Sequence, residues 1–124
     1  MGFVNLILSV FQAAGLALIN LPTFLGDSTK STQAYGPHPR QVLDWYMGEG
    51  KNRPLVIFFY GGNWQAGRRS DYRFVADSLL GIGFDVVIPD YRLFPEVRFG
   101  EIIADARASV DHILGQRDKR VFLM

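Results

Sequence analysis

The feature that most constrains this sequence is a continuous apolar run, Leu55 to Tyr60, which ends abruptly at Gly61-Gly62. A strand with one face in water alternates apolar and polar residues, whereas an unbroken run of this length is typical of a strand buried on both faces. Such strands occur in parallel sheets, whose crossover helices cover both faces. The run therefore predicts an α/β fold.

The segment after this run has the pattern of a crossover helix. Apolar residues recur at helical spacing after Ser70, the expected N-cap, and before the stop at Gly81: Tyr72, Val75, Ala76, Leu79 and Leu80. A second apolar run, Phe84 to Asp90, then predicts another buried strand. Strand, helix and strand in this order predict a right-handed parallel crossover.

Three further elements complete the expected domain. Gln41 to Met47 is interpreted as a short edge strand, and residues 120–124 as the start of a third strand. Between them, residues 101–114 predict a helix with one apolar side: Ile102, Ile103, Ala106, Val110, Ile113 and Leu114. We expect an α/β chain with a mostly parallel sheet and flanking helices.

Residues 1–26 contain no Lys, Arg, Asp, Glu or His and predict an apolar N-terminal helix. Its length suits a bilayer, but Asn5, Ser9 and Gln12 form a weak polar stripe, so a helix packed on the domain and a membrane-associated helix both stay open. A cleaved signal is disfavoured because no basic residue precedes the apolar stretch. We therefore favour a cytoplasmic or membrane-associated protein, with a second region over residues 27–124 that begins with a polar connection.

Composition excludes several classes of function. Thirteen Lys and Arg against 12 Asp and Glu give a net charge of +1, which argues against a nucleic-acid partner. The absence of cysteine excludes a thiolate metal site and a catalytic thiol. His38 and His112 have no second ligand at helical spacing, so we expect structural or solvent-facing histidines, no metal and no cofactor.

The turn after the first apolar run is the candidate site, because open α/β sheets bind ligands at the carboxyl ends of their strands. A dinucleotide fingerprint fails, since Gly61 and Asn63 do not form G-x-G. In a phosphate loop, Gly62 and Gly67 have the right spacing, but two arginines follow in place of Lys and Ser/Thr. An anion-binding turn with exposed amides and an ordinary glycine turn are the remaining interpretations.

Three motifs in order resemble those of α/β-hydrolase esterases related to hormone-sensitive lipase and kynurenine formamidase. Residues 60–64 (YGGNW), with Gly67 three residues on, are similar to the HGGxW-x-x-G turn of that family. Residues 90–96 (DYRLFPE) resemble the YRLxPE stretch after the next strand, and Asp105-Ala106 resembles a helical Asp-Ala pair. The resemblance covers residues 55–124 and implies the N-terminal portion of an α/β-hydrolase fold, an incomplete one.

This resemblance assigns roles to the turn. Its implied oxyanion hole comprises Gly61, Gly62 and Asn63, with the amides of the last two facing the oxyanion and the first shaping the turn. Tyr60 stands where the family usually has a His that holds the loop, and a phenol can take part of that role. The implied loop-supporting residues are Tyr60, Trp64, Gly67, Asp90 and Arg92.

The family's nucleophile elbow, G-x-S-x-G, follows the strand that here ends at Met124. The resemblance therefore implies that the catalytic Ser, Asp or Glu, and His lie beyond Met124. Ser70, Ser78 and Ser109 fall on predicted helices without a glycine elbow, so we expect them to be caps or surface residues.

Other charged residues near the turn are expected to be structural. We predict a salt bridge between Arg92 and a carboxylate such as Asp105, in preference to a carboxylate-pair mechanism by Asp90 and Glu96. The basic residues at the start of the first helix are expected to form a solvated patch: Arg68, Arg69 and Arg73.

The resemblance implies an N-terminal fragment of a serine carboxylic-ester hydrolase acting on a small-molecule ester, or on an arylamide or formamide. On its own, such a fragment is expected to be inactive. The alternative is a non-catalytic, truncated or pseudoenzyme chain that serves as an interaction module or associates with a membrane through residues 1–26.

Overall fold

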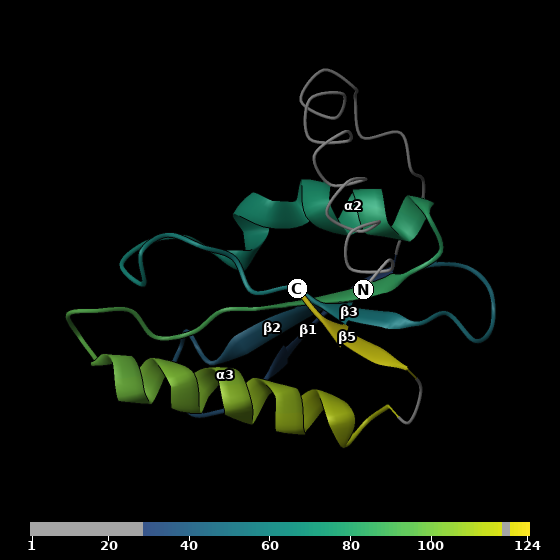
Figure 1. Ribbon diagram of the computed structural model, residues 1–124. Coiled ribbons are helices and arrows are strands. Elements are labelled where there is room, and N and C mark those ends of the chain that lie inside the picture. The colour runs from purple at the N-terminus through teal and green to yellow at the C-terminus, as the bar shows by residue number, and fades with distance from the viewer. Residues whose placement is uncertain (1–28, 118–119) are drawn as a thin grey trace.

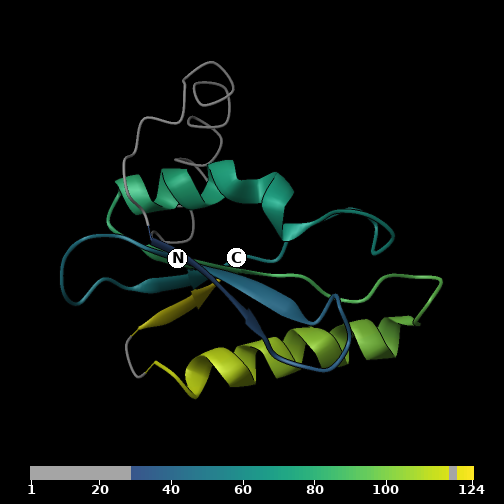
Figure 2. The same cartoon turned by 180° about the vertical axis from the view of Figure 1, so that it is seen from behind.

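The computed structural model describes residues 29–117 and 120–124, which form a five-stranded sheet with a helix on each face (Figures 1 and 2). In chain order the elements are β1 (Thr29–Ala34), β2 (Val42–Met47), β3 (Leu55–Ile57), the 3-10 helix η1 (Arg69–Tyr72), α2 (Arg73–Gly81), β4 (Asp85–Pro89), α3 (Phe99–Leu114) and β5 (Val121–Leu123). The predicted apolar helix of residues 1–26 and the boundary after it lie outside the described residues. Neither described α-helix has the length and apolar character that a membrane crossing requires.

The sheet has the strand order β1-β2-β4-β3-β5. Strand β3 pairs in parallel with β4 and with β5, as the predicted crossover requires. Strand β2, however, runs antiparallel to both β1 and β4. Strands β1, β3, β4 and β5 therefore run in the same direction and β2 alone is reversed, so the sheet is mixed but mostly parallel, as predicted. The short connection between β1 and β2 permits only an antiparallel pair.

Alternate residues of the central strands enter two separate cores, which explains their unbroken apolar character. One core includes residues of β3 and β4 together with residues of α2: Val56, Val86, Ile88, Val75 and Leu79. The other core includes a residue of α3: Leu55, Ile57, Val87 and Ile113. Complete burial of each such side chain contributes about 1.5–3 kcal/mol, so the predicted two-sided burial is confirmed and accounts for much of the stability.

Strand β1 was not predicted, since Thr29 to Thr32 read as a polar connection. It pairs with β2 from Thr29 opposite Met47 to Ala34 opposite Val42. Its side chains are mostly exposed, so main-chain hydrogen bonds hold it without an apolar pattern in its sequence. Strand β2 is consequently an interior strand rather than the predicted edge strand.

The helices match their predicted ranges with two corrections. Ser70 lies inside η1 and does not cap α2, whose N-cap is Tyr72 without a side-chain hydrogen bond. Helix α3 begins at Phe99, and two of its predicted core residues, Ile103 and Leu114, are 46% and 49% exposed. The buried face of α3 is rotated away from these two residues because it includes Asp105, a carboxylate that pairs with a neighbouring arginine. The buried residues of the helix are Ile102, Asp105, Ser109 and Ile113.

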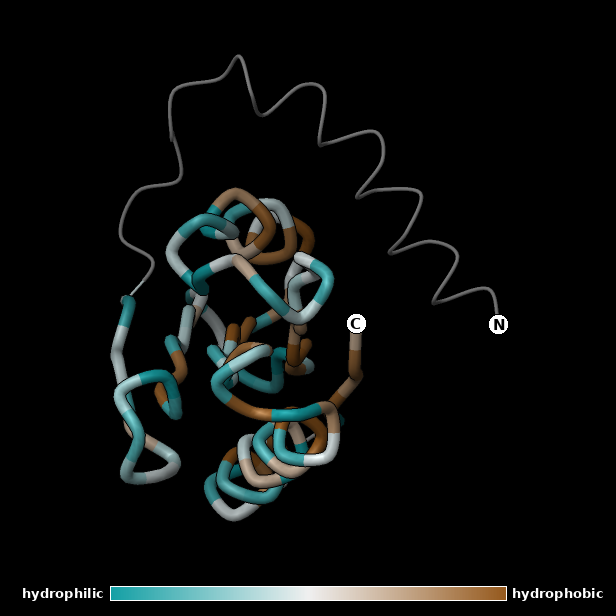
Figure 3. Tube along the Cα trace, turned by 90° about the vertical axis from the view of Figure 1, so that its left-hand side faces the viewer, coloured by the Kyte–Doolittle hydropathy of each residue, from teal (hydrophilic) through white to brown (hydrophobic). Residues whose placement is uncertain are grey.

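Strand β5 forms the other edge of the sheet. It is hydrophobic up to the C-terminal end of the chain (Figure 3). Leu123 is 64% exposed, whereas the edge strand β1 exposes mainly polar residues. The two edges of the sheet therefore differ sharply in polarity.

Candidate active site

The candidate site lies where two parallel strands end side by side. The chain leaves β3 at Ile57 and enters the segment of residues 58–68, and it leaves β4 at Pro89 directly before Asp90. Main-chain hydrogen bonds from Phe58 to Val87 and from Phe59 to Met124 extend the ladder past the last assigned residue of β3. The carboxyl ends of the parallel strands β3, β4 and β5 thus lie together at one end of the sheet, where the sequence places the candidate site.

We call residues 60–67 the oxyanion loop, after the role expected from its sequence. Its backbone is unusual: Gly62 and Gly67 have φ of 131° and 107°, and Asn63 and Trp64 have φ of 56° and 63°. A Cβ atom on Gly62 would lie 2.3 Å from the Ala66 carbonyl oxygen, so only glycine fits there.

Two successive non-glycine residues in the left-handed region cost roughly 1–2 kcal/mol each, and the cost is smaller for Asn than for Trp. Such strain persists only where the surroundings hold it. At Gly61, by contrast, φ is not left-handed and a Cβ atom would meet nothing within 4 Å. The backbone turn therefore does not itself require glycine at position 61, although a side chain there would reduce the space beside the loop.

A cavity of about 300 Å³ adjoins the oxyanion loop and is lined by Tyr60, Gly61, Gly62, Asn63, Trp64 and Tyr91. In the part of the chain that the structure describes, no backbone carbonyl accepts a hydrogen bond from the amide of Gly62 or of Asn63. Free main-chain N–H groups beside a cavity are the donors that stabilise a developing oxyanion. The expected oxyanion residues therefore lie together at a cavity.

Aromatic rings fix the far side of the loop. Trp64 packs against Tyr91 and Phe99, with ring centroids 5.7 and 5.5 Å apart. Its carbonyl oxygen accepts a hydrogen bond of 2.8 Å from the amide of Phe94. These contacts hold Trp64 in its left-handed conformation while 44% of its surface stays exposed.

Tyr60 anchors the start of the loop. Its ring stacks between Tyr72 and Tyr91, and its hydroxyl donates a hydrogen bond of 2.5 Å to Asp90 Oδ1. Burial, and then the hydrogen bond to Asp90, raise the pKa of the Tyr60 hydroxyl far above its ordinary value of 10.0. The phenol therefore remains protonated. It supports the loop from the position at which the family that the sequence resembles usually has a His.

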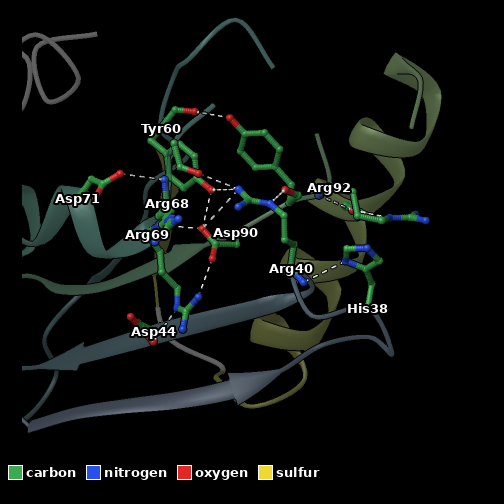
Figure 4. A network of polar contacts seen from close by, with 12 residues as sticks. His38, Arg40, Asp44, Tyr60, Arg68, Arg69, Asp71, Asp90 and Arg92 are labelled. Atoms are coloured by element: carbon green, nitrogen blue, oxygen red, sulfur yellow. Dashed lines mark hydrogen bonds and ion pairs between the residues drawn. The ribbon is translucent and has the colours of Figure 1, made fainter. Parts of the chain in front are cut away.

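Asp90 connects this anchor to the end of the loop. Its carboxylate accepts hydrogen bonds from the Arg69 amide at 2.7 Å and from Arg69 Nη1 at 2.5 Å. Arg69 Nε also forms an ion pair with Asp44 Oδ1 at 3.0 Å. Burial lowers the pKa of Arg69, but the two carboxylates outweigh this effect and raise it. Figure 4 shows these side chains converging between the sheet and the loop.

The predicted solvated patch of arginines is therefore wrong for Arg69. Its side chain is only 26% exposed and neutralises two carboxylates that are almost fully buried. Arg73 fits the prediction, since its side chain is 52% exposed and lies 3.9 Å from Asp77. Asp44, which belongs to β2 and is 0% exposed, was missed by the sequence reasoning, although a carboxylate between Leu43 and Trp45 in an apolar strand signals a buried cation nearby.

Arg40 is the second residue that sequence reasoning missed. Its Nη2 donates to Tyr60 Oη at 3.0 Å and to the Gly67 carbonyl at 2.8 Å. Its Nε donates to the Tyr91 carbonyl at 2.8 Å. No motif marks this position, because Arg40 lies in the connection between β1 and β2, 20 residues before the loop that it contacts.

The predicted salt bridge between Arg92 and Asp105 is confirmed. Arg92 Nε and Nη2 lie 2.9 and 2.8 Å from the two carboxylate oxygens of Asp105. Burial alone raises the pKa of Asp105, but hydrogen bonds from Arg92 and Gln41 outweigh it and lower the pKa below its ordinary value of 3.8. Arg92 thus ties the segment after β4 to α3 and supports the loop only indirectly.

His38, Ser78 and Ser109 make structural contacts. His38 Nδ1 accepts the Arg40 amide at 3.0 Å, and its Nε2 lies 2.8 Å from Glu96. Ser78 and Ser109 donate to helical carbonyls of their own helices. Among the described residues, no three His, Asp or Glu side chains are grouped as a metal site requires.

A parallel crossover, a left-handed glycine turn beside a cavity at its carboxyl end and a supporting Tyr–Asp pair are the features expected of an α/β-hydrolase of the esterase type. The family model named BD-FAE matches residues 43–120. The chain belongs to this family.

Known relatives agree with this class. An isoprenylcysteine alpha-carbonyl methylesterase of Arabidopsis thaliana is 27% identical over 114 residues, which are 82% of this chain and 26% of the relative. A kynurenine formamidase of Danio rerio is 31% identical over 84 residues, 66% of this chain and 29% of the relative. The chain thus spans about a quarter of the length of these curated relatives.

Solved structures show the same fold. Esterase B from Lactobacillus rhamnosis superposes with a TM-score of 0.70 at 27% sequence identity. That match covers 99% of this chain and 45% of the esterase. The five strands and two helices therefore correspond to part of an α/β-hydrolase fold.

Proposed function

We propose that this chain supplies the N-terminal part of the catalytic domain of a serine carboxylic-ester hydrolase, with residues 27–124 as its hydrolase region. The observation that carries the proposal is that, among the described residues, no carbonyl accepts a hydrogen bond from the amides of Gly62 and Asn63, which lie at the cavity beyond the end of β3. In acyl transfer, the carbonyl oxygen becomes negative as the nucleophile attacks. A main-chain donor aimed at that oxygen is worth roughly 3–4 kcal/mol of transition-state stabilisation.

The arrangement of the strands supports placing the nucleophile after β5. Strand β5 is parallel to β3, and the Met124 carbonyl accepts a hydrogen bond from the Phe59 amide. Residues that follow Met124 therefore emerge next to the oxyanion loop. A Gly-x-Ser-x-Gly elbow at this point would bring its Ser close to Gly62 and Asn63, and the acid and His would come from later segments.

The relatives indicate the chemical range of substrates. One is named a methylesterase and another a formamidase. The first name describes cleavage of an acyl group from an oxygen, and the second describes cleavage of an acyl group from a nitrogen. We extend this range to the present chain: its complete enzyme hydrolyses a small-molecule ester, arylamide or formamide whose carbonyl oxygen enters the cavity beside Trp64. Attack of the Ser hydroxyl forms an acyl-enzyme and releases the alcohol or amine, and water then releases the acid.

The test measures hydrolysis of p-nitrophenyl acetate by the 124-residue chain and by the same chain extended with its native downstream codons. We expect serine-dependent turnover, blocked by an organophosphonate, only in the extended protein. Serine-dependent turnover by the 124 residues alone would contradict the placement of the nucleophile. An extended protein with an intact fold and no hydrolytic activity on esters or formamides would contradict the enzymatic function.

A further inference from the structure

The two ends of the oxyanion loop are joined by one side chain from outside it. Arg40 Nη2 donates to Tyr60 Oη at the start of the loop and to the Gly67 carbonyl at its end. Its Nε donates to the Tyr91 carbonyl, in the segment that supplies the cavity wall. A planar guanidinium offers donors in a fixed fork, so one residue can hold three acceptors in a single geometry.

We propose that Arg40 is a positioning residue for ester hydrolysis, which keeps the amides of Gly62 and Asn63 in their productive orientation. This inference rests on the proposed function. Arg40 itself does not line the cavity, so it acts on the reaction only through the loop.

Arg40 is well held for this role. Its amide donates to His38 Nδ1 at 3.0 Å, and the other ring nitrogen of His38 lies 2.8 Å from Glu96, in the segment after β4. The Arg40 side chain is 23% exposed and its Nη2 lies 4.0 Å from Asp90 Oδ1. Its charge therefore offsets part of the negative charge of Asp90 while its nitrogens bind main-chain oxygens.

The loop needs such a connection because its shape is strained. Asn63 and Trp64 occupy the left-handed region, which few non-glycine residues adopt without support. If the ends of the loop separate, the backbone at these two positions relaxes toward ordinary φ values and the amides turn away. A second connection runs from Tyr60 through Asp90 to Arg69, so loss of Arg40 loosens the loop without releasing it completely.

The chain offers a matched control at the opposite end of β4. Arg53 Nε donates to Asp85, and its Nη2 donates to the carbonyls of Leu80 and Phe84. Arg53 also donates to the Glu49 carbonyl at 3.1 Å, so like Arg40 it binds main-chain carbonyls beside a buried acid, but it makes no contact with the oxyanion loop. Arg53→Gln is expected to destabilise the fold as much as Arg40→Gln does.

The experiment compares Arg40→Gln, Arg40→Lys and Arg53→Gln in the protein labelled with 5-fluorotryptophan. The Trp64 signal is assigned from its loss in Trp64→Phe, and Trp45, which is 6% exposed, serves as the internal reference. We expect Arg40→Gln to shift or broaden the fluorine NMR signal of Trp64 and to leave that of Trp45 in place. Arg40→Lys should recover part of this effect, and Arg53→Gln should leave Trp64 unchanged at a similar loss of Tm.

Kinetics with p-nitrophenyl acetate, measured in the protein extended with its native downstream codons, supply the second measurement. Arg40→Gln should lower kcat between about tenfold and about a hundredfold, less than complete loss of one oxyanion donor, with KM changed less than about twofold. Equal kinetic losses in Arg40→Gln and Arg53→Gln, or an unchanged Trp64 signal in Arg40→Gln, would overturn the proposal. If the extended parent protein hydrolyses no ester, the proposed function fails, and the Trp64 signal of the 124-residue chain still decides whether Arg40 sets the loop.

Discussion

Strand β4 has a buried acid at each end, and the two acids serve different purposes. Asp85 opens the strand and Asp90 follows its last residue, and each is 3% exposed. Asp85 accepts hydrogen bonds from Arg53 at 3.0 Å and from Arg117 at 2.7 Å. Asp90 is bound by Arg69 in the same manner, at 2.5 Å. The ion-pair chemistry of the two ends is therefore nearly the same.

The backbone that each cluster holds is different. At the Asp85 end, Arg53 binds the carbonyls that close α2 and begin β4. At the Asp90 end, the cluster holds a loop in which Asn63 and Trp64 are both left-handed and whose amides border a cavity. A buried Asp–Arg cluster is thus a general anchor for strand ends in this protein. What marks the candidate site is the strained backbone that the anchor maintains.

The largest expected effects come from removing either acid. Asp85→Asn and Asp90→Asn should each lower the free energy of unfolding by about 3–5 kcal/mol, because buried arginine charges lose their partners. Urea unfolding measures this loss. In a Trp45→Phe background, only Asp90→Asn should also shift the emission of Trp64. Equal shifts in both variants would break the distinction between the two ends.

Glycines with positive φ allow a second comparison. Gly62→Ala places a Cβ atom 2.3 Å from a carbonyl oxygen, whereas Gly50→Ala, in the turn before β3, meets nothing within 4 Å. We expect a loss of about 2–4 kcal/mol for Gly62→Ala and of about 1 kcal/mol for Gly50→Ala, measured by thermal unfolding. A Gly62→Ala variant as stable as Gly50→Ala would show that the loop is not rigidly held.

The acid limb of the stability curve tests the contact between the segment after β4 and α3. Because the pKa of Asp105 is lowered in the folded chain, its contribution to stability is complete above its ordinary value of 3.8 and is lost as the pH falls through the lower folded pKa. Asp105→Asn should therefore be less stable than the parent at pH 6 and should show a smaller loss on acidification. A parallel pair of curves would contradict this assignment.

The smallest expected effect is that of Arg73→Ala. Its side chain is 52% exposed and lies 3.9 Å from Asp77, so the free energy of unfolding should change by less than about 0.5 kcal/mol. Arg69→Ala, four residues earlier in the sequence, serves as the contrast and should cost several times more. Similar losses in urea unfolding would mean that burial does not separate these two arginines.

The elements that the sequence predicts well are those whose own apolar pattern indicates that they are buried. The apolar runs that contain Val56 and Val86 identify β3 and β4, because both faces of these strands are covered. Strand β1 escapes prediction since Thr29 to Ala34 are mostly exposed and their strand conformation depends on pairing with β2. Local patterns carry no information about such a partner.

The candidate site divides in the same way. The turn from Gly61 to Trp64 is recognisable because its residue types stand at a fixed spacing, and at Gly62 the backbone admits only glycine. Arg40 and Arg69 are not recognisable as loop supports, since their roles arise from contacts across 20 and 21 residues of sequence. Asp44 is intermediate: a carboxylate inside an apolar strand indicates that a cation lies nearby but does not identify the residue that supplies this cation.

Asn63 lines the cavity with its backbone in the left-handed region, which limits the residue types that suit this position. A residue that tolerates a left-handed φ preserves the course of the backbone, and Asn, Gly and Asp do so at the smallest steric cost. Within that set the side chain beside the cavity can vary in size and charge while the backbone stays constant. Under the proposed function, the loop could therefore adapt to different substrates while its main-chain donors stay in place.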